Sequence, residues 1–374
     1  MKLHLPPEQR FECTSCGRCC RAAWTIAVDA PAEPGIRDSL AFGSRAREGY
    51  LPLILVDGRL ATARSADRSC TFLDDANLCE LHRELGGEQK PLVCQTYPYL
   101  LTETPDGIYA TLSYACPAAL ENVGPLLQDE QAGLERLIAR RWPEMPQGTP
   151  VGQRVEVLSG SWLDWTDYLR LEVEVLKAFN PAQPVESLLG AAIHLILAQS
   201  EEGDFALPQG GLALPYNFGE FDRQLATMVS CNLIAIAEEV TAPEERAQLG
   251  SLLWNGGRYV SNRFQQELPV FSLRRPSTEL AQELIGRYVR NAVFGKRLLA
   301  GTVVSRLLGL VCGLAILLFY TEAFSRQDSD GLPALDRAFT LVESELLSHT
   351  RSFDGFFVEF ETSLCNVRDS LRGH

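Results

Sequence analysis

The run that decides the fold is Cys13-Thr-Ser-Cys16-Gly-Arg-Cys19-Cys20, which places four thiols within eight residues. Two-residue spacing lets two thiolates converge on one ion within a single tight turn, and Gly17 removes the steric penalty for the backbone twist that this requires. Such dense runs also ligate iron–sulfur clusters, in which a third or fourth cysteine serves another iron or cluster. We therefore expect a metal or iron–sulfur centre near the N-terminus.

The other cysteines are unevenly distributed. Of the 11 cysteines, eight fall in the first 116 residues, and Cys231, Cys312 and Cys365 are interpreted as core residues. In a reducing cytoplasm, clustered thiols are more often metal ligands than disulfides. Those that follow the first run are far apart in sequence, so the fold has to assemble them. The predicted metal ligands are Cys13, Cys16, Cys19, Cys20, Cys70, Cys79, Cys94 and Cys116.

The identity of the metal is left open by the residue types. Thiolate sets suit zinc or iron–sulfur clusters, whereas calcium and magnesium prefer oxygen ligands. Eight cysteines can build one four-iron cluster plus a zinc, two zinc sites, or one centre with spare thiols. His82 follows Cys79 by three residues and can complete a site, but an exposed histidine outside the ligand set fits equally well.

Two short hairpins are expected in the cysteine-rich part, which otherwise has the composition of loops. Asp57-Gly58 and Asp106-Gly107 suit tight turns, because glycine tolerates the positive φ that such turns need. Pairing in the second hairpin would bring together its flanking residues, Cys94 and Cys116. The paired segments expected are 53–56 with 60–62 and 99–102 with 108–112.

After Cys116 the pattern changes to helices. Apolar residues recur at helical spacing, and Pro143, Pro146 and Pro150 then interrupt the pattern. The amphipathic runs are 117–141, 162–179, 185–199, 218–240, 277–294 and 333–347. The sequence thus predicts an α+β protein with a cysteine-rich domain at 1–120, a helix and Pro-rich linker at 121–160, and an α-helical domain at 161–374.

Charge and hydropathy exclude several classes of partner. With 48 acidic and 34 basic residues, the net charge of −14 gives no electrostatic footprint for nucleic acid or anionic lipid. The most apolar stretch, 307–320, is shorter than the roughly 20 residues of a membrane-spanning helix, so a buried core helix is expected. The first residues lack the pattern of a signal or transit peptide. We expect a cytoplasmic protein that binds neither nucleic acid nor membranes.

The cysteine pattern resembles a known family. The N-terminal run, Cys70-x-Phe-Leu, Cys79 and Cys94-x-x-Tyr97-Pro98 resemble the CxxCxxCC family of zinc- or iron-chelating proteins, over roughly residues 11–117. A closer likeness is to the flagellin lysine-N-methylases, which share this cysteine module and carry a helical C-terminal region. The segments that carry the second likeness are 19–24, 77–86, 112–117 and 283–294.

The methylase resemblance implies transfer of methyl groups from S-adenosylmethionine to lysine side chains, with an iron–sulfur centre such as 4Fe-4S and flagellin as the protein substrate. The sequence shows neither the glycine-rich turn of a Rossmann-type methyltransferase nor a C-x3-C-x2-C radical pattern. Lysine must be neutral to attack a methyl sulfonium, so a methylase needs a channel that deprotonates the amine. Candidates for such a channel, each of which also fits a structural role, are Tyr97, Tyr99, Tyr114, Glu80 and Asp74.

Three functions are compatible with the sequence. The leading hypothesis is a metal- or cluster-binding protein related to lysine N-methyltransferases. The alternative is a non-enzymatic module that stores, delivers or senses zinc or iron through the same thiols. A third hypothesis, a redox protein that passes electrons through its cluster, requires a partner that the sequence does not identify.

Overall fold

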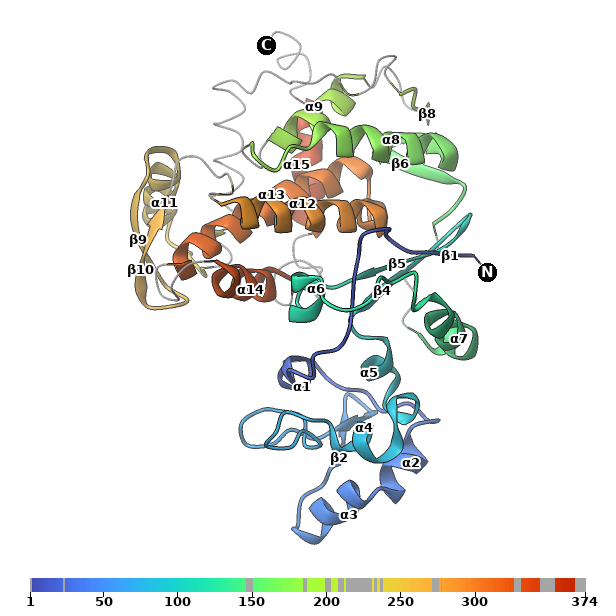
Figure 1. The fold of residues 1–374 in the computed structure, drawn as a ribbon. Coiled ribbons are helices and arrows are strands. Elements are labelled where there is room, and N and C mark those ends of the chain that lie inside the picture. The colour runs from blue at the N-terminus through green and yellow to red at the C-terminus, as the bar shows by residue number, and fades with distance from the viewer. Residues whose placement is uncertain are drawn as a thin grey trace. The chain divides into compact units, whose positions relative to one another are not determined.

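The computed structural model describes residues 2–22, 24–145, 151–183, 187–198, 203–207, 212, 231, 234–235, 238–270, 276, 278–325, 331–343 and 354–366. By its internal contacts the chain divides into two compact units. Unit 1 comprises Met1–Leu101 and Ala110–Gly148, and unit 2 comprises Thr102–Tyr109 and Thr149–His374. Short strands and short helices make up unit 1, whereas longer helices dominate unit 2 (Figure 1). The predicted α+β class is confirmed, and the domain limits drawn from the sequence stay predictions.

The first predicted hairpin is present in unit 1. It consists of β2 (Leu53–Val56) and β3 (Arg59–Thr62), which pair antiparallel. Asp57 and Gly58 form the two-residue turn with φ values of 49° and 74°. Positive φ at both central positions matches the right-handed twist of the flanking strands, which explains why this dipeptide predicted the turn correctly.

The helices of unit 1 are short. They are α1 (Arg18–Arg21), α2 (Glu33–Asp38), α3 (Leu40–Arg47), α4 (Glu80–Leu85), η1 (Gly87–Gln89), α5 (Leu92–Thr96), α6 (Pro117–Glu121), α7 (Gln131–Arg141) and η2 (Trp142–Glu144). Helices of one or two turns are not stable alone. A buried cluster that includes Ile36, Phe72 and Leu81 holds several of them, and Cys70 belongs to the same cluster.

The second predicted hairpin is also confirmed. It is formed by β4 (Tyr99–Thr104) and β5 (Gly107–Leu112), and β1 (Leu3–His4) adds to it in the order β1-β5-β4. At its base, the amide of Ser113 donates to the carbonyl of Pro98 at 2.8 Å, so its two ends meet as expected.

The run 117–141 is not one continuous helix, which corrects the sequence-based prediction. Helix α6 ends at Asn122, which has a φ of 59°. Gly124, with a φ of 98°, lies against the N-terminal segment, where a Cβ would stand 2.5 Å from Glu12 Cβ. The backbone then forms a bridge between Arg10 and Leu126 before α7 begins. The helix ends here because residues 124–126 pack against the N-terminal segment at residues 10–12.

Unit 2 is built around one long apolar helix. Its elements are β6 (Arg154–Leu158), β7 (Ser161–Asp164), α8 (Trp165–Ala178), α9 (Ser187–Ala198), β8 (Gly203–Asp204), α11 (Pro243–Asn255), β9 (Gly257–Ser261), β10 (Gln266–Val270), α12 (Glu279–Phe294), η3 (Arg297–Leu299), α13 (Val303–Ser325), α14 (Leu332–Leu341) and α15 (Asp354–Asn366). Helix α13 packs against α9, α14, α15 and strand β6. Its 18-residue apolar window is long enough to cross a membrane, but 89% of that window is buried inside the protein. This agrees with the core helix expected at 307–320.

Three other predicted helices correspond to α9, α12 and α14, although α14 begins one residue before the predicted start. The run 162–179 is corrected at its start, because 161–164 is strand β7 and the helix begins at Trp165. Strand β6 occupies part of the segment assigned to the linker. Most of the run 218–240 lies outside the described residues.

Candidate metal centre

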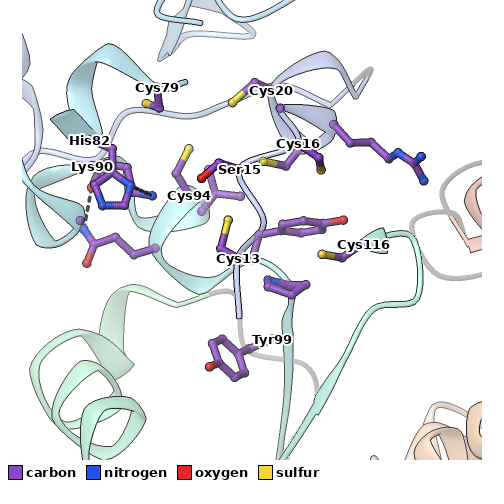
Figure 2. Close-up of a pocket in the computed structure, with 18 of the residues that line it drawn as sticks. Cys13, Ser15, Cys16, Cys20, Cys79, His82, Lys90, Cys94, Tyr99 and Cys116 are labelled. Carbon is purple, nitrogen blue, oxygen red and sulfur yellow. Dashed lines mark hydrogen bonds between the residues drawn. The ribbon is translucent and has the colours of Figure 1, made fainter. Parts of the chain in front are cut away.

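A single cavity of about 430 Å³ in unit 1 brings most of the predicted ligands together (Figure 2). Seven of the eight predicted cysteines line it: Cys13, Cys16, Cys19, Cys20, Cys79, Cys94 and Cys116. Cys70 does not line the cavity and lies buried behind it, in the same apolar cluster against which Cys20, Cys79 and Cys94 pack. Segments spread over about a hundred residues of sequence thus converge on one site.

The backbone of the first cysteine run, residues 13–20, makes a sharp turn, which we call the knuckle. Ser15 and Gly17 both have positive φ, at 55° and 71°, which turns the backbone sharply between Cys13 and Cys19. A Cβ on Gly17 would stand 3.2 Å from Asn77 Cβ, so glycine is also needed for close packing. The one-turn helix α1 follows and carries Cys19 and Cys20.

Backbone hydrogen bonds join Cys70 to this knuckle. The amide of Cys70 donates to the carbonyl of Cys20 at 2.7 Å. The Arg64 guanidinium donates to the same carbonyl and to that of Ala22, each at 2.8 Å. An isolated bridge between Arg64 and Cys70 completes the junction. These contacts use the backbone of Cys20 and Cys70, whereas the Cys70 thiol donates to the Thr62 hydroxyl at 3.6 Å.

Cys79 is positioned by a turn around Asp74. One Asp74 oxygen accepts from the amides of Ala76 and Leu78 at 3.0 and 2.9 Å, and the other pairs with Arg83 at 2.7 Å. These contacts lower the pKa of Asp74, the amide of Leu78 contributing most. Asp74 therefore has a structural role here.

The last two predicted ligands flank the two ends of the β4–β5 hairpin. Cys94 lies in α5 and Cys116 caps the N-terminus of α6. Between them, the Tyr97 ring packs edge-on against Trp24 with centroids 4.7 Å apart. The Tyr97 side chain therefore packs α5 against the segment that follows the knuckle.

The thiols fall into two neighbourhoods. In Figure 2 the Cys94 sulfur points toward Cys79 and Cys20, whereas Cys13 and Cys16 are the thiols whose charges act on Cys116. Burial raises the pKa of Cys94, with a further contribution from repulsion by Cys70 and Cys79. Burial also raises the pKa of Cys116 to about 11, with repulsion from Cys16 and Cys13.

Cys19 differs from the other thiols. The hydrogen bond from the Cys20 thiol lowers the pKa of Cys19 to about 7, and Lys90 acts in the same direction. The same bond raises the pKa of Cys20. A thiolate is the form that binds metal, so these interactions favour the metal-binding form of Cys19.

The thiols nevertheless do not form a closed coordination shell. Among the residues that the structure describes, no three His, Cys, Asp or Glu side chains are grouped so as to hold an ion. The donor set suits zinc or iron, because it is almost wholly sulfur, but the side chains must turn toward a common point to bind it.

Some of the other predicted site residues line the cavity, and others do not. His82 lines the cavity, 3.5 Å from the Lys90 ammonium, and burial and Lys90 lower its pKa. Of the predicted amine channel, Tyr97 and Tyr99 line the cavity. Glu80 pairs with Arg45 at 2.5 Å, and the hydroxyl of the fully buried Tyr114 donates to Gln9 at 3.3 Å.

The three remaining cysteines lie in unit 2. The Cys231 thiol donates to the carbonyl of Arg246 at 3.4 Å, Cys312 is in the core helix α13, and Cys365 is in α15. None lines the cavity. Sequence reasoning missed the cationic part of the cavity wall, consisting of Arg18, Lys90, Arg136 and Arg140.

Comparison with known proteins supports zinc or iron chelation by the cysteine-rich part of the chain. Residues 12–117 match the model of the CxxCxxCC family, described as a "putative zinc- or iron-chelating domain". No curated protein and no solved structure matches the chain. No matching protein therefore supports the resemblance to flagellin lysine-N-methylases.

Proposed function

We propose that unit 1 holds zinc or iron through the cysteine thiolates at its cavity. The observation that carries this proposal is the convergence of seven thiols, from segments before and after the β4–β5 hairpin, on one cavity. Buried free cysteines that served only as small apolar residues would have no reason to line a common cavity. The family match over 12–117 supports the same conclusion.

Two sets of residues are the best candidates for the ligands. Cys19, Cys20, Cys79 and Cys94 would supply one set, with Cys70 behind them, and Cys13, Cys16 and Cys116 would supply the other. A bound zinc would crosslink the short elements of unit 1, and a bound iron–sulfur cluster would in addition accept and donate electrons. Because the ligands must lose protons and draw together, metal affinity is also folding free energy.

Anaerobic purification followed by elemental analysis and absorption spectroscopy tests the proposal. We expect at least one equivalent of zinc or iron per chain. A brown preparation with charge-transfer absorption would identify an iron–sulfur cluster, and a colourless zinc-containing one a thiolate zinc site. A chain that retains neither metal after anaerobic reconstitution would refute the proposal.

Protein lysine methylation is the finer prediction, and the sequence resemblance alone supports it. Titration of the metal-loaded protein with S-adenosylmethionine tests it directly. Saturable binding at one site would favour the methyltransferase over a storage, delivery or sensing role. Absence of binding, with the metal content unchanged, would remove the methyltransferase and leave the non-enzymatic chelating module or the redox protein.

A further inference from the structure

Exposed apolar side chains gather in one short stretch of unit 1. Among the described residues, five of the ten exposed large apolar side chains lie between residues 40 and 55. Four of them follow closely on one another: Tyr50 is 64% exposed, Leu51 76%, Ile54 37% and Leu55 73%. Single exposed apolar residues need no explanation, but a cluster of them indicates an interaction surface.

This cluster lies along strand β2, which has one open edge. Within the described part of the chain, β2 pairs with β3 alone. The far edge of β3 is covered by residues 26–28, because the amide of Val28 donates to the carbonyl of Leu60 at 2.8 Å. The amide of Thr62 likewise donates to the carbonyl of Ile26 at 3.0 Å. An open edge such as that of β2 is a template for pairing with a further strand.

The register of the hairpin shows which backbone groups face the open edge. The two residues that flank a two-residue turn form a hydrogen-bonded pair, and such pairs recur at every second residue. The amide of Ala63 accordingly donates to the carbonyl of Pro52 at 2.8 Å. Even-numbered residues of β2 therefore direct their backbone groups toward β3, and the amides and carbonyls of Leu53 and Leu55 point outward.

The open edge lacks the features that protect edge strands. Proteins usually block such edges with charged side chains, bulges or proline. Residues 49–56 have no charged side chain, although 22% of the whole chain is charged. The pairing of β2 with β3 is regular from Leu53 to Val56, without a bulge. Pro52 does not block the edge, because it is an even-numbered position and the amide that it lacks would face β3.

The geometry of this edge favours a second copy of the chain as its partner. Two β2 strands related by a twofold axis run antiparallel, which allows Leu53 of each copy to stand opposite Leu55 of the other. The outward amides and carbonyls then form about four hydrogen bonds between the copies. Ile54 stands opposite its own counterpart on the axis. Since residues 49–56 are uncharged, no charge in this stretch faces a like charge.

An unrelated peptide fits the edge less well. Domains that bind peptides by strand addition use pockets for alternate side chains to obtain specificity. Here the Leu55 side chain protrudes, and no residue between 27 and 76 lines the cavity of unit 1. A protruding apolar side chain is better buried against an identical strand.

We propose that β2 is a self-association surface, on which two copies of the chain pair their β2 strands antiparallel with the two Ile54 residues facing each other. The dimer then contains a continuous sheet in the order β3-β2-β2-β3. Because each copy contributes only one short strand, we expect weak association, with a dissociation constant of about 1–100 µM. The proposal goes beyond the metal function and does not depend on it.

Sedimentation equilibrium of the full-length protein between about 1 and 200 µM tests the proposal across this range of affinity. Anaerobic, reducing buffer prevents disulfides, and the metal content of each sample is recorded. Leu55→Lys should weaken the dimer by about tenfold or more, because a lysine on an open edge opposes strand pairing. The control Val260→Lys, at a 62% exposed residue of β9 in unit 2, should associate as the parent does.

A pair of variants at Ile54 tests the register. Ile54→Lys and Ile54→Glu should each weaken self-association by about tenfold or more, because like charges then face each other across the axis. An equimolar mixture of the two should form a heterodimer, since opposite charges then face each other. Circular dichroism of each variant separates a loss of pairing from a loss of folding.

Several outcomes would overturn the proposal. A folded parent that stays monomeric throughout the range would leave the edge to a strand of another protein. Unchanged association of Leu55→Lys, equal weakening by Val260→Lys, or a mixture of the Ile54 variants that does not associate would each refute the proposed pairing. With the metal content intact, the proposed metal function survives any of these results. A protein that holds no metal would refute that function, whatever its state of association.

Discussion

The backbone amide of Cys70 donates a hydrogen bond to the carbonyl of Cys20 at 2.7 Å, which joins two cysteine-bearing segments that are far apart in sequence. The bond uses backbone groups alone. Assembly of the thiols therefore depends first on the folding of unit 1, and metal binding then adds to the stability of an arrangement that the backbone already favours.

Replacement of Cys16 or Cys19 with Ser should release metal and destabilise unit 1. A hydroxyl is a poor substitute for a thiolate ligand, and the lost metal affinity is lost folding free energy. Elemental analysis and urea unfolding of anaerobically prepared variants measure both effects. The control variants Cys231→Ser and Cys365→Ser should keep the parental metal content, because these thiols lie in unit 2. Full metal in the first pair, or loss in the second, would contradict the ligand assignment.

Arg64→Met should lower the free energy of unfolding by about 2–4 kcal/mol. The substitution leaves the carbonyls of Cys20, Ala22 and Trp24 without the guanidinium that now donates to them. Urea denaturation measures the loss. The exposed Arg59→Met should change stability by no more than about 0.5 kcal/mol. If both variants unfold at the same urea concentration, Arg64 has no role in holding the knuckle.

Local signals in the sequence predicted much of unit 1. Asp57-Gly58 predicted its hairpin because the backbone demand of the turn is met by the dipeptide itself. Ser159-Gly160, with a φ of 76° at the glycine, signals the β6–β7 turn in the same way. Helical spacing continues back to residue 162, and for this reason the sequence predicts a helix where strand β7 lies.

The sequence could not predict which residues, far apart in the chain, the fold brings to the cavity. Nothing local distinguishes Cys70, which lies behind the cavity, from Cys79, which lines it. The spacing of Gly133, Arg136, Leu137 and Arg140 shows a shared helix face, but only the fold shows that this face lines the thiol cavity.

Gly124→Ala should destabilise the protein by about 1–3 kcal/mol, because a positive φ and close backbone contact both oppose a side chain there. Its φ is 98°, and a Cβ would stand 2.6 Å from the amide nitrogen of Glu12. Gly43→Ala, inside α3 with its closest contact at 3.5 Å, should instead be neutral or stabilising. Thermal unfolding of both variants makes the comparison. If Gly43→Ala lowers the melting temperature and Gly124→Ala does not, residues 122–126 do not pack tightly against the N-terminal segment.

Glu361 should give unit 2 a measurable pH dependence. Burial raises the pKa of this carboxyl, although it accepts hydrogen bonds from Thr302 and from the amide of Ser159. A folded-state pKa above the unfolded value means that the folded state binds more protons, so the stability contribution is full at low pH. It is lost as the pH rises from about 4.5 through the raised folded pKa.

Glu361→Gln should remove this dependence, since the amide can accept from Ser159 and donate to Thr302 at every pH. Urea unfolding between pH 4 and 8 measures the slope for parent and variant. Glu359→Gln, an exposed site on the same helix, should keep the parental slope. A slope that survives unchanged in Glu361→Gln would assign the titration to another group.

The ion pair between Lys296 and Glu172 is buried in unit 2. The Lys296 side chain is 2% exposed and its ammonium lies 4.1 Å from the centroid of the Tyr109 ring. Replacement of Lys296 with Met should cost about 3–5 kcal/mol, because the Glu172 carboxylate then remains buried without a cation beside it. Denaturant unfolding measures the cost.

Removal of both charges separates the worth of the pair from the penalty for breaking it. The double variant Lys296→Met with Glu172→Leu should regain most of the stability that Lys296→Met loses, since apolar groups of similar size replace the pair. The exposed pair of Lys177 with Glu174, at 2.7 Å on α8, provides the control, and Lys177→Met should change stability by less than about 1 kcal/mol. If the double variant is no more stable than Lys296→Met, the ammonium is needed for its contact with the Tyr109 ring, and the loss cannot be attributed to an uncompensated carboxylate.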